Sequence, residues 1–150
     1  MKGIEPLTSS QSDEWTTPEW IFKQLDDEFG FNLDPCCTHD SALCERHYTK
    51  EEDGLKKSWG GATVFVNPPY SQISKWVEKS YTESLKPGTL VCMLIPARTD
   101  TKYFHDYILN RSEVRFIKGR LKFSDSKNSA PFPSMVVIFR SARYKKEGTP

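Results

Sequence analysis

The sequence predicts an α/β fold: a Rossmann-like, mostly parallel central sheet with helices on both faces and an antiparallel edge strand. Three observations lead to this class. Apolar strand-like runs alternate with amphipathic helical segments along the chain. The runs at 62–66 and 89–95 are apolar on both faces, as in covered parallel strands. The last two strand-like segments, 120–123 and 134–140, follow each other without a helix between them, which predicts an antiparallel pair.

The first predicted helix begins at Thr17-Pro18-Glu19, where a threonine caps the helix and proline occupies its first position. It ends at Gly30, a residue typical of the position just past a helix. Its apolar side chains recur at helical spacing: Trp20, Ile21, Leu25 and Phe29.

A short strand at 31–34 is expected next, and it ends in a turn at Pro35-Cys36-Cys37-Thr38 because proline cannot donate to a ladder. A helical turn at 41–46 and a strand at 48–49 follow. The strand 62–66 leads into Asn67, and amphipathic spacing predicts a helix over 73–85 that Pro87-Gly88 terminates. Beyond the strand 89–95 we expect a helix at 103–109 and a strand at 114–117.

The chain has 150 residues, which suits one domain. Residues 14–143 are predicted to form it, between a flexible N-terminus at 1–13 and a flexible tail at 144–150, both rich in polar residues. Neither a signal peptide nor an apolar run of ~18 residues is present. We therefore expect a cytoplasmic protein with no membrane association, and its four cysteines as free thiols.

The net charge of the chain does not by itself indicate a nucleic-acid partner. Lysine and arginine number 21 against 20 acidic residues, a net charge of +1. Basic residues do gather between Arg111 and Lys146, where a solvated basic face is the alternative to a binding surface.

Asn67-Pro68-Pro69-Tyr70 directly follows a buried strand. Its two prolines remove two backbone donors and hold the chain extended, so carbonyl groups there have no competing amide. The Asn67 side-chain oxygen and the Pro68 carbonyl can together accept both hydrogens of one amino group, and Tyr70 offers a face on which a planar ring can stack.

Such acceptors suit methyl transfer to an amine conjugated with a ring. Hydrogen bonds to both N–H groups draw the nitrogen toward tetrahedral geometry, and they strengthen as the nitrogen becomes positive. The alternative is a purely structural Pro-Pro turn.

Several segments, in this order, resemble the phage and prophage DNA N-6-adenine methyltransferases of the Dam type. They are Trp15-Thr16-Thr17-Pro18, Glu28 to Pro35, Asp53-Gly54-Leu55 with Trp59, Asn67 to Ser71, Gly119 to Phe123 and Ala130 to Ser134. The resemblance spans residues 14–140 and implies transfer of a methyl group from S-adenosyl-L-methionine to N-6 of adenine in double-stranded DNA. It also implies a phage or prophage gene expressed in a bacterial cell.

The resemblance implies a cofactor site made of Thr17, Pro18, Asp34, Pro35, Cys36, Asp53 and Asn67, and a catalytic loop of Asn67, Pro68, Pro69 and Tyr70. In the cofactor loop, Cys36-Cys37-Thr38 replaces the usual glycine-rich form. The acid at the cofactor ribose is not assigned, with Glu45 and Glu51 as candidates.

Methylating an amine inside a duplex requires flipping the base out. Tyr70 is expected to stack on one face of the flipped adenine and Phe123 on the other, unless Phe123 belongs to the core. Arg98 and Arg120 are expected to contact DNA, with a solvated loop as the alternative.

Three alternatives stay open from the sequence. No metal is predicted, but Cys36, Cys37, His39, Cys44 and His47 lie close enough in sequence for a structural zinc site, although adjacent cysteines are not the usual ligand spacing. A second alternative keeps the cofactor and changes the acceptor to a protein glutamine amide or an RNA base. The third is a DNA-binding module without catalytic activity.

Overall fold

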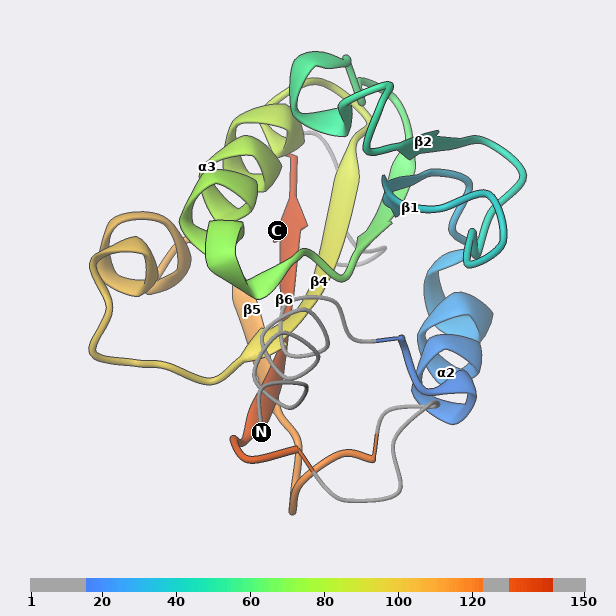
Figure 1. Ribbon diagram of the computed structural model, residues 1–150. Helices are drawn as coiled ribbons and strands as arrows, with labels where there is room; N and C mark the ends of the chain where they lie inside the picture. Colours follow the sequence, from blue (N-terminus) through green and yellow to red (C-terminus); the bar gives the residue numbers. More distant parts are fainter. Residues whose placement is uncertain (1–15, 123–129, 142–150) are drawn as a thin grey trace, which may run out of the picture.

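The computed structural model describes residues 16–122 and 130–141. The predicted flexible ends, 1–13 and 144–150, lie outside these residues, as do Phe123 and the polar loop 124–129. Helical and strand segments alternate along most of the described chain, with two consecutive strands near each end (Figure 1). None of the described helices is long and apolar enough to cross a membrane.

A mixed sheet forms the centre of the molecule (Figure 1), with spatial order β3 (Thr63–Val66), β4 (Leu90–Pro96), β6 (Ser134–Arg140) and β5 (Glu113–Phe116). Strands β3 and β4 are parallel, and β6 is antiparallel to both β4 and β5. A parallel pair, β1 (Asp34–Cys37) and β2 (His47–Thr49), connects to β3 through a parallel bridge between Leu33 and Val64. The predicted α/β class with mostly parallel strands is confirmed.

The predicted edge position of the antiparallel strand is wrong. Strand β6 lies inside the sheet between β4 and β5, and its partner is β5 rather than the predicted strand 120–123. The physical reason is burial. The first six residues of β6 are all buried, so their backbone groups need a hydrogen-bonded strand on each side. The edge falls instead to β5, whose Glu113 and Arg115 are half-buried and charged.

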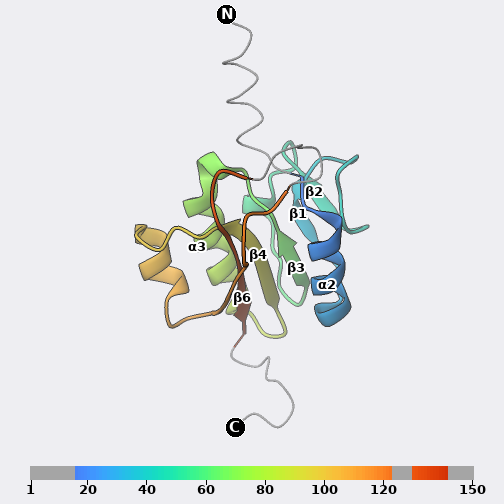
Figure 2. The ribbon, with the colours of Figure 1, turned by 90° about the horizontal axis from the view of Figure 1, so that it is seen from below.

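Helices cover both faces, as predicted (Figure 2). Helix α2 (Glu19–Phe29) packs through Ile21 and Leu25 on the face that carries Phe65. Helix α3 (Ile73–Ser84) and the π-helical turn η3 (Phe104–Ile108) pack on the face that carries Val64 and Val66. Alternate residues of β3 therefore feed two cores, which is the expected geometry of a covered strand.

Three local predictions are wrong. Thr17 does not cap α2: Pro18 is the N-cap residue, and the Thr17 hydroxyl instead accepts a hydrogen bond from Asn67. Pro35 does not end its strand, since β1 continues to Cys37 with an irregular register against β2 that accommodates the missing amide. The predicted helical turn at 41–46 is irregular chain. Gly30 does end α2, in the left-handed conformation at φ 71°.

An ion-pair network ties the end of α2 to the sheet edge. Arg115 binds both carboxylate oxygens of Glu28, at 2.7 and 2.8 Å, and its Nε donates to Glu113 at 2.7 Å. Arg140 donates to the other oxygen of Glu113 at 2.6 Å, and both arginines lie over the ring of Phe29. Two of the late basic residues are therefore structural.

Glu83 on α3 is a buried charge with three partners. Its carboxylate accepts from the Trp59 amide at 2.6 Å, from Lys86 at 2.8 Å and from Lys79 at 3.1 Å. Burial opposes ionisation of Glu83, but the hydrogen bonds from Lys86, Trp59 and Lys79 outweigh it and hold the pKa below its usual value. These contacts anchor the turn before β3 to α3.

We predict that Glu83→Gln lowers the free energy of unfolding by about 3 kcal/mol at pH 7, because it breaks a buried ion pair. Since the folded pKa of Glu83 is depressed, its contribution is present above the unfolded value of about 4.3 and is lost as pH falls through the folded pKa. Urea denaturation at pH 7 and pH 3.5 measures this difference. Asp27→Asn removes an exposed pair with Lys23 and serves as the control that changes stability little.

Candidate functional site

Strand direction brings distant segments to one end of the sheet, the edge formed by the carboxyl ends of the parallel strands. The parallel strands β3 and β4 both end there, and the antiparallel β6 begins there. Asn67, which follows β3, and Ala97, which follows β4, therefore lie beside the segment that enters β6. The Ala97 amide donates to the Pro133 carbonyl at 2.9 Å, which ties the two segments together.

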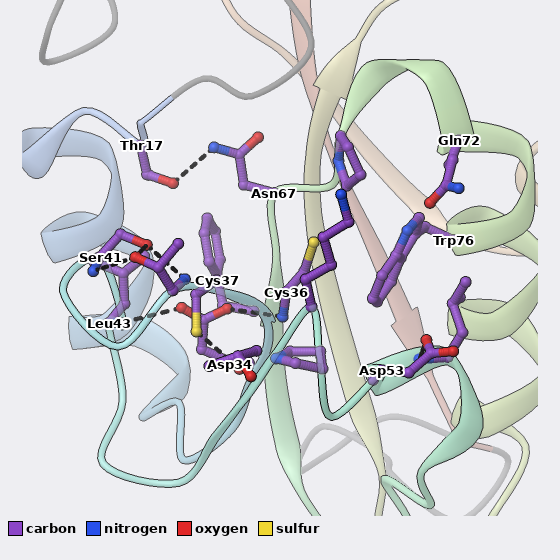
Figure 3. A pocket seen from close by; sticks show the side chains of 18 of the residues that line it. Thr17, Asp34, Cys36, Cys37, Ser41, Leu43, Asp53, Asn67, Gln72 and Trp76 are labelled. Atoms are coloured by element: carbon purple, nitrogen blue, oxygen red, sulfur yellow. Dashed lines mark hydrogen bonds between the residues drawn. The ribbon is translucent and has the colours of Figure 1, made fainter. Parts of the chain in front are cut away.

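A cavity of about 700 Å³ opens beside this edge (Figure 3). Its size is in the range of small-molecule and cofactor sites. Four stretches of chain contribute side chains to it, and these lie within 16–17, 34–43, 49–55 and 65–76. The cavity therefore joins the segment before α2, the β1 loop, the region after β2 and the loop after β3.

Asn67 is held at the cavity by a hydrogen bond across 50 residues of chain. Its Nδ2 donates to the Thr17 hydroxyl at 2.9 Å. Figure 3 shows that this contact turns the amide nitrogen toward Thr17 and the carbonyl oxygen Oδ1 away from it. The buried Pro68 and the extended Pro69 (φ −64°, ψ 137°) follow directly, and the Pro69 carbonyl accepts from the Gln72 amide at 3.0 Å. The acceptor groups predicted from sequence are thus on a rigid segment.

Asp34 organises the loop that walls the cavity. Its carboxylate accepts from the Leu43 amide at 3.0 Å and from the Cys36 amide at 3.3 Å, and only 3% of the residue is exposed. Burial raises the pKa of Asp34 to about 6, although the Leu43 and Cys36 amides oppose that rise. The cavity is therefore lined by an acid, Asp34, that changes its protonation state near pH 6 (Figure 3).

Asp53 and Gly54 form another part of the wall, next to Pro35. Asp53 adopts the left-handed conformation at φ 57°, and its side chain accepts from the Leu55 amide to cap the short 3₁₀ helix η1 (Gly54–Lys56). The Gly54 carbonyl accepts from the Trp59 indole at 3.0 Å. A Cβ on Gly54 would lie 2.1 Å from the Pro35 carbonyl oxygen, so this wall and strand β1 can approach only with glycine here.

Tyr70 does not line the cavity, although Pro69 and Ser71 on either side of it in sequence do. Its ring contacts Phe132 edge to face, with centroids 5.2 Å apart and planes at 75°. Burial raises the pKa of Tyr70 well above its usual value, while the nearby charge of Arg98 opposes that rise. The phenol therefore stays neutral at any ordinary pH.

The structure brings most of the predicted cofactor residues together. Thr17, Asp34, Pro35, Cys36, Asp53 and Asn67 line the cavity, together with Pro69 of the predicted catalytic loop. Pro18 and Pro68 are buried and do not line it. Of the two candidate ribose acids, Glu51 lines the cavity and Glu45 does not.

Sequence reasoning missed Gln72, Trp76 and Lys50, which also line the cavity. Trp76 lies in the predicted helix 73–85, where amphipathic spacing indicates packing and no contact with a ligand. One signal was available, because the first turn of a helix that follows Asn67–Tyr70 must lie at the same sheet edge. Trp76 also stacks on Trp59, with centroids 6.2 Å apart and planes at 21°.

Arg98 and Arg120 are exposed, as a contact with a large partner requires. Arg98 follows β4, and its carbonyl accepts from the Thr101 hydroxyl at 2.8 Å. Arg120 lies in the segment after β5, which ends at the same sheet edge because β5 and β4 are both antiparallel to β6. Phe123 lies outside the described residues.

The alternative of a zinc site finds no support in the described part of the chain, where no three potential ligands cluster as a metal ion needs. His39 instead contacts His47, with Nδ1 and Nε2 2.9 Å apart. The Cys37 thiol lies within hydrogen-bonding distance of the Asp34 and Tyr48 carbonyls, at 3.6 and 3.7 Å. Cys36, Cys37, Cys44 and Cys92 are free thiols.

Gly54→Ala is predicted to destabilise the protein, because the added Cβ meets backbone rather than a movable side chain. Gly60→Ala is the matched control, since its Cβ would meet side chains alone, the closest being the flexible Lys86 side chain at 3.2 Å. We expect the first variant to lower the melting temperature by several degrees more than the second in a thermal scan. Equal melting temperatures would show that the close approach to Pro35 is not a constraint.

Comparison with known proteins identifies relatives for this architecture and site. A family model, DNA N-6-adenine-methyltransferase (Dam), matches residues 6–148. A DNA N-6-adenine-methyltransferase of Haemophilus phage HP1 is 28% identical over 138 residues, covering 87% of this chain and 80% of the relative. Another, of Escherichia phage T1, is 32% identical over 111 residues, covering 73% of this chain but only 46% of the relative, so the chain spans about half the length of that protein. The chain belongs to the DNA N-6-adenine-methyltransferase (Dam) family.

Proposed function

We propose that this protein transfers a methyl group from S-adenosyl-L-methionine to N-6 of adenine in double-stranded DNA, after flipping the base out of the duplex. The observation that carries the proposal is the Asn67 amide, which Thr17 orients at the mouth of a cofactor-sized cavity. Membership of the Dam family and the names of the two phage relatives support the choice of adenine in DNA.

The cavity residues fit the proposed cofactor. S-adenosyl-L-methionine supplies an electrophilic methyl group on a positively charged sulfur, together with an amino group, a ribose and a purine. Asp34 and Asp53 both line the cavity with carboxylates, which suits a ligand with a cationic part and hydroxyl groups. Trp76 adds an aromatic surface beside Asp53 for a planar ring (Figure 3).

Asn67 and Pro68 orient the acceptor amine in this mechanism. The Asn67 Oδ1 and the Pro68 carbonyl accept its two N–H bonds, so the nitrogen lone pair points toward the methyl group. Both hydrogen bonds strengthen as positive charge develops on the nitrogen, which stabilises the transition state more than the ground state. No strong base would be required: the sulfur would leave as a neutral thioether, and the nitrogen, once cationic, would lose its proton to water.

Residues outside the cavity would hold the DNA. Tyr70 stacks on the flipped adenine and so offsets part of the few kcal/mol lost on unpairing and unstacking. Arg98 and Arg120 are exposed on the same edge of the sheet, where they can contact phosphates. The proposed roles therefore assign the cofactor to the cavity and the base to Tyr70, which does not line it.

We predict that Asn67→Ala lowers the rate of methyl transfer by about 10²- to 10³-fold, because it removes one preorganised acceptor. Transfer of a tritiated methyl group to unmethylated duplex DNA measures the rate, and calorimetry measures cofactor affinity. Affinity should change little. Thr17→Val, which keeps Asn67 and removes the hydroxyl that orients it, should give an intermediate rate. Unchanged activity of Asn67→Ala would refute the catalytic assignment.

Cofactor affinity should depend on pH through Asp34, whose pKa of about 6 is raised by burial. A cationic ligand favours the carboxylate, so affinity should be constant above about pH 7 and about tenfold weaker at pH 5. The folding stability of the ligand-free protein depends on pH in the opposite direction. Protonated Asp34 contributes to the free energy of unfolding at low pH, and this contribution is lost as pH rises through about 6. Calorimetric titration between pH 5 and 8 tests the affinity, with Asp34→Asn expected to abolish its dependence on pH. A flat profile for the unsubstituted protein would contradict this role.

A further inference from the structure

The contact between Tyr70 and Phe132 joins the two cores at the end of the sheet. Tyr70 is half-buried and packs against the core on the α3 side, whereas Phe132 packs against the core on the α2 side. Their ring centroids are 5.2 Å apart with planes at 75°, an arrangement that aromatic pairs favour. This contact therefore links the Tyr70 ring to both layers of the molecule.

Phe132 is itself held firmly. It lies between Pro131 and Pro133, whose rings restrict the backbone on either side. The Pro133 carbonyl accepts from the Ala97 amide at 2.9 Å, and β6 begins at the next residue. The Phe132 ring is thus presented to Tyr70 from a segment anchored on β4 and β6.

The geometry excludes a second stacking role for Phe132. A base between two aromatic rings needs two gaps of about 3.5 Å, which is about 7 Å between ring planes. The Tyr70 and Phe132 centroids are only 5.2 Å apart, and the rings are nearly perpendicular. A base can reach Tyr70 only from a direction that Phe132 does not occupy.

We propose that Phe132 is a positioning residue, which prevents rotation of the Tyr70 ring and so holds it in the plane on which the target adenine stacks. This inference rests on the proposed function. It assigns to Phe132 a role in orienting the base through Tyr70, without contact between Phe132 and the base. Misorientation of a bound reactant lowers the rate of the chemical step even where binding is retained.

Phe132→Leu removes the ring and keeps apolar volume, and Phe132→Tyr restores the ring. The chain offers a matched control in Phe22→Leu. Phe22 is half-buried, packs against the same core and contacts Phe65 edge to face, with centroids 5.2 Å apart and planes at 81°, on the side of helix α2. Should Phe132→Leu show no melting transition, Phe132→Met takes its place, because its flexible side chain fills irregular space.

The experiment first establishes that the unsubstituted protein methylates adenine in duplex DNA. It then compares melting temperature, cofactor affinity, kcat and KM for DNA among the variants. We expect Phe132→Leu to lower kcat by about tenfold or more at unchanged cofactor affinity, Phe132→Tyr to restore it to within about threefold, and Phe22→Leu to lower the melting temperature without changing kcat beyond about twofold.

Equal kcat for Phe132→Leu and Phe22→Leu would overturn the inference, as would failure of Phe132→Tyr to restore the rate. Both results leave the proposed function intact, because the unsubstituted protein is active in them. No methylation of DNA by the unsubstituted, folded protein would instead overturn the proposed function, and the role of Phe132 with it.

Discussion

The abrupt end of β3 is the constraint on which the rest of the site depends. This strand is buried on both faces and leaves the sheet at Asn67, where Pro68 and Pro69 remove the donors that would continue the ladder. The chain therefore turns away with its carbonyl groups and the Asn67 side chain at the sheet edge. Asn67 and Pro69 of this short segment line the cavity, whereas Tyr70 at its end does not.

Long-range contacts complete this edge, and each comes from a different part of the chain. Thr17, which precedes α2, orients the Asn67 amide. Gly54 lets the wall after β2 close against Pro35. The antiparallel direction of β6 brings Phe132 to the end of β3, where a parallel strand would have carried it to the other end of the sheet. A site of this kind requires the whole sheet to be formed.

Sequence reasoning predicted the features that local chemistry decides. The burial of β3, the loop at Asn67 and the end of α2 at Gly30 all follow from neighbouring residues. Features decided by distant partners were missed. Thr17 was expected to cap a helix because nothing near it in sequence reveals Asn67, and β6 was placed at an edge because strand order depends on burial across the entire sheet. The sequence analysis assigned no role to Phe132 for the same reason, since its partner Tyr70 is 62 positions away in the chain.

Methyl transfer to N-6 of adenine in DNA, the function we propose, is tested most directly by sequencing that detects modified bases. The DNA comes from cells that express either the unsubstituted protein or Asn67→Ala, starting from a strain without adenine methylation. We predict N-6-methyladenine with the unsubstituted protein and none above background with the variant. Absence of modified adenine despite folded, expressed protein, or methyl groups found only in protein or RNA, would contradict the account.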